Sequence, residues 1–183
     1  MAISNQFRDE LLATIPSLRA FGLSLTSRGD RADDLVQETL MKAWKHHESY
    51  TAGTNMKAWL YTILRNEFYT QLRKRKREVE DADGFYSNKV AVHAEQESYV
   101  DMADFTIALA KLPEDQREAI VLVGASGFSY EQAAEICGCA LGTIKSRVNR
   151  ARGKLSELLQ IEDIRRSSVE STIGTVMRQA KRA

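Results

Sequence analysis

The residues best suited to chemistry lie between Gly142 and Lys154, where five lysines and arginines occur without a single acid. Apolar residues recur there at helical spacing, so the polar side chains share the opposite side of a predicted helix. Such a helix can neutralise phosphates and hydrogen-bond to base edges in the major groove of DNA. The side chains available for this are Thr143, Lys145, Ser146, Arg147, Asn149, Arg150 and Arg152. The pattern indicates DNA binding.

A helix-turn-helix is the element that would position these side chains. A short helix is expected over residues 130–136, and a longer one from about residue 141. The turn between them contains Gly138, with Ala134 four residues before it and Ile144 six residues after it. A small residue, a glycine turn and an apolar anchor at these positions let two helices cross closely.

A second basic block precedes an acidic one, although the whole chain carries a net charge of only +1. Residues 65–77 hold six basic residues and one acid, and residues 78–104 hold eight acids and one lysine. Two basic blocks in separate helical segments favour a polyanionic partner over two merely solvated faces. The acidic stretch has a weak apolar pattern and is typical of a linker.

The remaining pattern predicts an all-α protein of two small helical domains joined by a flexible acidic linker. Helical periodicity runs through the first 77 residues, and Pro16 is expected to begin a new helix there. The 183 residues include only two prolines and ten glycines, which disfavours an all-β fold rich in turns. We expect domains at 1–77 and 102–160, the second containing the helix-turn-helix, a linker at 78–101, and a tail at 161–183 without an assigned role.

Several classes of protein are disfavoured. No apolar stretch approaches the roughly 20 residues of a membrane span, and charges interrupt the N-terminal region where a signal peptide would be apolar. We therefore expect a cytoplasmic protein without membrane contact. Cys137 and Cys139 are too few for a disulfide framework or a four-ligand zinc site. His46, His47 and His93 form no catalytic or metal-binding spacing, so we expect no enzyme, metal or cofactor.

Four blocks of sequence, in order, carry a family resemblance. They are residues 33–39 with 42–44, residues 57–63 with 65–66, residues 112–113 with 116–118 and 130–134, and residues 142–147 with 150–152. Together they resemble bacterial RNA polymerase sigma factors of the extracytoplasmic-function type. Residues 127–130 and 136–140 are similar to a narrower branch, the general stress response sigma factors of alphaproteobacteria.

The resemblance implies a protein that binds core RNA polymerase and directs it to −10 and −35 promoter elements, the latter of GGAA type. The implied partners are the β′ clamp helices and β flap of the polymerase, promoter DNA, and a small anti-sigma factor that holds the protein inactive. The chain would act as a monomer or as a 1:1 heterodimer with that inhibitor.

The resemblance also implies site residues. Core polymerase would bind Asp34, Gln37, Glu38 and Met41 on the outward face of an acidic helix. The −10 element, with a base flipped out of the opened strand, would contact Tyr50, Tyr61, Asn66, Tyr69, Arg73 and Arg75, with Tyr61 and Tyr69 expected as exposed aromatics. In the second domain Lys145, Ser146, Asn149 and Arg150 would face −35 bases, whereas Thr143, Arg147 and Arg152 suit phosphates or shape contacts. Trp44 and Trp59 are expected in the core.

Two other functions explain part of the sequence. A one-domain repressor or activator accounts for residues 102–159 but leaves residues 33–77 without a role. A sigma-like decoy that binds the anti-sigma factor without binding DNA has no need of five basic residues on its recognition helix. A working sigma factor accounts for both halves.

Overall fold

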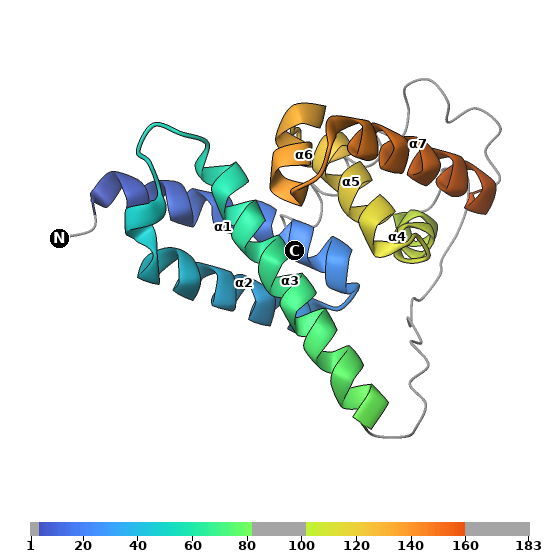
Figure 1. Ribbon diagram of the computed structural model, residues 1–183, viewed down its shortest axis with the longest axis horizontal. Helices are drawn as coiled ribbons and strands as arrows, with labels where there is room; N and C mark the ends of the chain where they lie inside the picture. Colours follow the sequence, from blue (N-terminus) through green and yellow to red (C-terminus); the bar gives the residue numbers. More distant parts are fainter. Residues whose placement is uncertain (1–3, 82–101, 160–183) are drawn as a thin grey trace.

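The computed structural model describes residues 4–81 and 102–159, and within those ranges the chain is entirely helical (Figure 1). The helices are α1 (Asn5–Thr26), α2 (Gly29–Lys45), the 3₁₀ turn η1 (His47–Ser49), α3 (Met56–Asp81), α4 (Met102–Ala110), α5 (Glu114–Gly124), α6 (Tyr130–Cys137) and α7 (Leu141–Leu158). This confirms the predicted all-α class. The linker predicted at 78–101 starts too early, because α3 continues to Asp81. Residues 82–101 and the tail predicted at 161–183 lie outside the described residues.

Helix α1 differs from the prediction, because Pro16 lies inside one continuous helix and does not begin a new one. Ser4 caps the N-terminus by accepting a hydrogen bond from the Phe7 amide at 3.1 Å. The buried stripe that starts at Phe7 continues past the proline to Leu18 and Leu25. Packing of both halves against one core outweighs the backbone hydrogen bond that proline removes.

Helices α1, α2 and α3 form the first unit (Figure 1). The turn between α1 and α2 depends on Ser27, whose φ of 55° is left-handed. Helix α2 passes close to Gly22, where a Cβ would meet the carbonyl oxygen of Ala32 at 3.5 Å, an ordinary van der Waals contact. Close crossing of α1 and α2 buries the inner side of α2 and leaves its other side outward.

Helices α4 to α7 form the second unit, in which α6 and α7 make the predicted helix-turn-helix (Figure 1). Ser129 and Gln132 form a capping box at the start of α6. Gly138 ends that helix with a φ of +61°, a conformation that side chains with a Cβ rarely adopt. Ile144 lies on α7 and is fully buried, as its spacing from the glycine predicts.

The two units pack against each other. Helix α3 lies against α6, and α1 lies against α5 and α4. The buried apolar residues of both units belong to one continuous core. Residues of α3 that point away from α1 and α2 therefore meet the second unit.

Candidate nucleic-acid and protein interfaces

The outward face of α2 carries all four residues predicted to bind the polymerase. Asp34, Gln37, Glu38 and Met41 are exposed, and Met41 is 66% exposed. The inner side of the helix buries its aliphatic residues in the core. The face thus offers two carboxylates and an amide around an apolar side chain, a combination suited to arginines on a partner protein.

Trp44 extends this face, which corrects the prediction that it lies in the core. Its side chain is 48% exposed, whereas its neighbour Ala43 is fully buried. The close contacts of α2 leave room for the small side chain at the inner position, so the indole points outward, three residues from Met41 on the same face. Trp59 is half-buried, and its ring centroid lies 5.3 Å from that of Tyr50.

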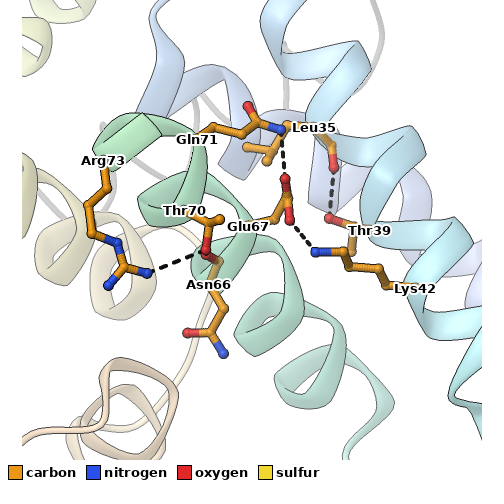
Figure 2. A network of polar contacts seen from close by, with 8 residues as sticks. All are labelled: Leu35, Thr39, Lys42, Asn66, Glu67, Thr70, Gln71 and Arg73. Atoms are coloured by element: carbon orange, nitrogen blue, oxygen red, sulfur yellow. Dashed lines mark hydrogen bonds and ion pairs between the residues drawn. The ribbon is translucent and has the colours of Figure 1, made fainter. Parts of the chain in front are cut away.

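A polar network fixes α2 to α3 (Figure 2). Glu67 on α3 is largely buried; it pairs with Lys42 of α2 and accepts a 3.0 Å hydrogen bond from Gln71. Burial raises the pKa of Glu67, but the hydrogen bonds from Lys42 and Gln71 outweigh it and hold the pKa below its ordinary value. Asn66, the next residue along α3, is exposed and points away from this network (Figure 2). The network thus orients Asn66, a predicted −10 contact.

The six predicted −10 residues differ in exposure. Asn66 and Arg73 are exposed, Tyr50, Tyr69 and Arg75 are half-buried, and Tyr61 is buried. Tyr50 donates a hydrogen bond to the carbonyl of Thr54 at 2.9 Å, which ties its ring to the loop before α3. The structure therefore presents Asn66 and Arg73 to solvent in this conformation, but not the whole set.

The expectation that Tyr61 is exposed is wrong for this structure, in which only 1% of the residue is accessible. Its ring stacks on Phe21 with centroids 4.6 Å apart, and its hydroxyl donates to the carbonyl of Ser17 at 2.9 Å. Phe128 of the second unit covers it edge-on at 5.1 Å. Burial raises the pKa of Tyr61, so the phenol remains a neutral donor.

Tyr69 is likewise not an exposed aromatic, because it is half-buried at the contact with the second unit. Its hydroxyl donates to Oε2 of Glu118 at 3.2 Å, and the Arg65 guanidinium lies 4.7 Å from its ring centroid. Burial and the neighbouring Glu118 raise the pKa of Tyr69.

Lys57 and Arg65 were not among the predicted site residues. With Tyr61, Tyr69 and Arg73 they form a stripe on α3 with a residue every four positions, alternating cation and aromatic. Residues four positions apart are neighbours on a helix surface, so this spacing is the sequence signal that could have linked them. We call these five residues the α3 stripe.

The predicted DNA contacts on α7 differ in solvent exposure. Lys145, Ser146, Asn149 and Arg150 are exposed, whereas Thr143, Arg147 and Arg152 are half-buried. The exposed set is the one expected to face bases.

Arg147 is anchored to the second unit. It forms an ion pair with Asp115 of α5, with Nε and Oδ2 3.0 Å apart, and its Nη1 lies 3.8 Å from Sγ of Cys139. These contacts fix Arg147 at the flank of α7, where a phosphate contact suits it better than base readout.

Cys137 is buried and shows no sign of a reactive thiol. Burial, together with the neighbouring Glu118, raises the pKa of Cys137 to about 12, so its thiol is protonated at neutral pH. Within residues 4–81 and 102–159 no cluster of histidine, cysteine and carboxylate side chains could hold a metal ion. In the same ranges no helix is long and apolar enough to cross a membrane.

Comparison with known proteins assigns both units. Residues 12–78 match the Sigma-70 region 2 family and residues 105–155 match the Sigma-70, region 4 family. The fold and its two surfaces thus define a sigma factor of the sigma-70 class. The chain is 54% identical over 97% of its length to the ECF RNA polymerase sigma factor EcfG of Rhodopseudomonas palustris, of which it covers 98%. It belongs to the extracytoplasmic-function (ECF) RNA polymerase sigma factors.

Two further relatives agree with this assignment. The ECF RNA polymerase sigma factor SigC of Mycobacterium tuberculosis is 35% identical over 73% of this chain and 72% of its own length. The sigma factor RpoE of Bartonella quintana, solved in complex with the anti-sigma factor NepR, superimposes with a TM-score of 0.79. That match has 60% sequence identity and covers 87% of this chain and 99% of the other.

Proposed function

We propose that this sigma factor binds the β′ clamp helices of core polymerase through α2, contacts −10 DNA through α3, and reads −35 DNA through α7. The single observation that carries the proposal is the outward placement of the α2 face and of the base-facing residues of α7. Both surfaces are accessible, and they have opposite charge. The acidic one suits arginines of a protein, and the basic one suits DNA.

The exposed Trp44 and Met41 give the α2 surface an apolar centre beside its carboxylates. Interfaces derive most of their affinity from a few aromatic or apolar anchors, while charges guide encounter and specificity. We therefore include Trp44 in the polymerase-binding surface. The β flap would contact the second unit, and the cytoplasm, where transcription occurs, is the expected location.

The general stress response is the proposed physiological role, with a small anti-sigma factor as inhibitor. The sequence identity to EcfG across nearly the whole chain supports this branch, and it favours a working sigma factor over a sigma-like decoy. The RpoE–NepR complex of Bartonella quintana supports an anti-sigma partner and a 1:1 heterodimer. We expect the inhibitor to cover polymerase-binding surfaces and leave both units folded, because each has its own buried stripe.

Holoenzyme assembly tests the proposed polymerase surface. The double variant Asp34→Lys, Glu38→Lys should lose most of its affinity for core polymerase, since two attractive charges become repulsive, and should keep its helical content because both side chains are exposed. Glu48→Lys, at an exposed position on η1, is the matched control. Normal assembly of the double variant with core polymerase in gel filtration would refute the α2 assignment.

The inhibitor's footprint has its own test. Hydrogen exchange with and without the anti-sigma factor should show protection on α2, on the second unit, or on both. Protection confined to residues 82–101 and 160–183 would contradict inhibition by occlusion.

A further inference from the structure

The loop between η1 and α3, residues 50–55, lies beside the N-terminal part of α1 (Figure 1). Its residues 51–55 are all exposed. The amide and the hydroxyl of Thr54 both donate to the carbonyl of Thr51, at 3.1 and 2.7 Å. Asn55 caps α3, because its side chain accepts a hydrogen bond from the amide of Ala58 at 3.1 Å. The loop is thus compact, accessible to solvent and anchored where α3 begins.

Tyr50 begins this loop, and its hydroxyl faces two acceptors. The carbonyl oxygen of Thr54 lies at 2.9 Å, and Oε2 of Glu10, on α1, lies at 3.3 Å. Burial and the charge of Glu10 raise the pKa of Tyr50, so the hydroxyl keeps its proton and the two acceptors share it. The contact with Thr54 lies within the loop and maintains its shape. The contact with Glu10 fixes the loop against a different helix.

The ring of Tyr50 is held from two sides. Its centroid lies 5.7 Å from that of Phe7 on α1 and 5.3 Å from that of Trp59 on α3, and the rings of Phe7 and Trp59 lie 6.1 Å apart. Aromatic pairs at these separations attract one another beyond their burial of apolar surface. Three elements therefore meet at Tyr50, and the N-terminal part of α1 contributes to both its ring and its hydroxyl.

The carboxylate of Glu10 is itself held in place on α1. Its Oε1 accepts a hydrogen bond from Nε2 of Gln6 at 3.0 Å, one helical turn away, so the two oxygens have separate partners. Glu10 is half-buried, and its backbone carbonyl accepts from the hydroxyl of Thr14 at 2.8 Å. A side chain with both oxygens engaged is restricted in its rotamers, so Glu10 presents a fixed acceptor to Tyr50.

Capture of an unstacked base depends on groups that already stand in place. Flipping a base out of the duplex costs free energy that contacts to the flipped base must offset. A loop that becomes ordered only at that moment offsets less, because ordering costs conformational entropy. Contacts that fix residues 50–55 against α1 and α3 before DNA arrives should therefore speed opening of the −10 strand.

We propose that Glu10 is a positioning residue for capture of the −10 strand. It holds Tyr50, and with it residues 50–55, in the place from which an unstacked base is bound. This inference rests on the proposed assignment of Tyr50 and α3 to the −10 element. A carboxylate makes no attractive contact with phosphates, so Glu10 acts through the hydroxyl of Tyr50 and not on DNA directly.

Three variants separate the hydrogen bond from the charge. Glu10→Ala removes both the acceptor and the negative charge. Glu10→Gln removes the charge alone, because the amide oxygen still accepts a hydrogen bond. Asp9→Ala is the matched control, since Asp9 is an exposed acid one residue earlier whose partner Arg8 is also exposed.

The assay uses the full chain assembled with core polymerase on a duplex promoter. A fluorescent adenine analogue in the −10 element brightens when it leaves the base stack, so its rate of brightening reports strand opening. The affinity for the same duplex at low temperature, where the strands stay paired, reports binding before opening. A merely structural defect would lower both quantities, whereas a positioning role affects only the first.

Glu10→Ala should slow brightening about 3- to 10-fold, the effect of one hydrogen bond, and leave the affinity for paired duplex within about twofold of wild type. Glu10→Gln and Asp9→Ala should match the wild type in both. On a Tyr50→Phe background, Glu10→Ala should cause no further slowing, because the hydroxyl through which it acts is gone.

Equal rates of brightening in Glu10→Ala and wild type would overturn the proposal. Glu10→Gln as slow as Glu10→Ala, an equal loss of duplex affinity, or slowing that persists on the Tyr50→Phe background would overturn it as well. A wild-type holoenzyme that binds the promoter without any brightening would instead refute the assignment of the first unit to the −10 strand.

Discussion

Replacement of Arg150 by alanine separates base readout from phosphate binding on α7. Arg150 is exposed, and within the described residues it makes no ion pair, so its guanidinium is available to a promoter. Arg147, three residues earlier on the same helix, is instead paired with Asp115. The two arginines therefore provide a matched comparison within one helix.

A bidentate contact from arginine to guanine contributes about 1–3 kcal/mol of discrimination, or about 5- to 150-fold in affinity. Arg150→Ala should lose that amount on a GGAA-type −35 element and much less on an element whose guanines are replaced. Arg147→Ala should weaken all sequences alike. Loss of its partly exposed pair with Asp115 should change the free energy of unfolding by no more than about 1 kcal/mol.

The assay is competition between promoters for reconstituted holoenzyme at one fixed salt concentration, since phosphate contacts depend strongly on salt. Lys154→Ala, an exposed cation at the far end of α7 paired with Glu157, is the control for loss of charge alone. An Arg150→Ala holoenzyme with the wild-type ratio of affinities for the two promoters would refute the proposed orientation of α7.

Three further outcomes are expected. Trp44→Ala should weaken core polymerase binding by about 2 kcal/mol, or about 30-fold. Helical content should not change, since the residue is 48% exposed. Unchanged affinity in a titration with core polymerase would exclude Trp44 from the interface. The folded state lowers the pKa of Glu67 below 4.5, so its pair with Lys42 contributes stability above that pH, and this contribution is lost as the pH falls through the lowered value. Lys42→Met should therefore lower the free energy of unfolding by about 1 kcal/mol at pH 7 and weaken its dependence on pH in the acid range. The same loss in the exposed control Lys45→Met would contradict this. Gly138→Ala should cost about 1–2 kcal/mol in the free energy of unfolding, measured by denaturant titration, because φ is +61°; an unchanged midpoint would show that the turn adapts.

Local signals in the sequence were sufficient for the helix-turn-helix. Ser129 and Gln132 are three residues apart and form the capping box, and Gly138 adopts the left-handed conformation expected of a turn. These features depend on neighbours within a few residues, so sequence spacing determines them. The exposed α2 face followed from helical periodicity in the same way.

Errors arose where distant segments decide the environment. Trp44 and Ala43 both fit an apolar stripe, and only the close packing of α2 determines which one turns inward. Tyr61 is buried by Phe21 of α1 and by Phe128 of the second unit, 67 positions away in the chain. No local pattern reports contacts at that separation. Pro16 was misplaced because its local preference was outweighed by continuous packing along α1.

Promoter-specific transcription in vitro decides whether this chain directs core polymerase to a promoter. Core polymerase from the same branch of bacteria would be incubated with the chain and a duplex template carrying a GGAA-type −35 element upstream of a −10 element. We expect a transcript from one defined start that requires the chain and that disappears with the Asp34→Lys, Glu38→Lys variant. Absence of any start-specific transcript from a chain shown to be folded and bound to core polymerase would contradict the proposed function.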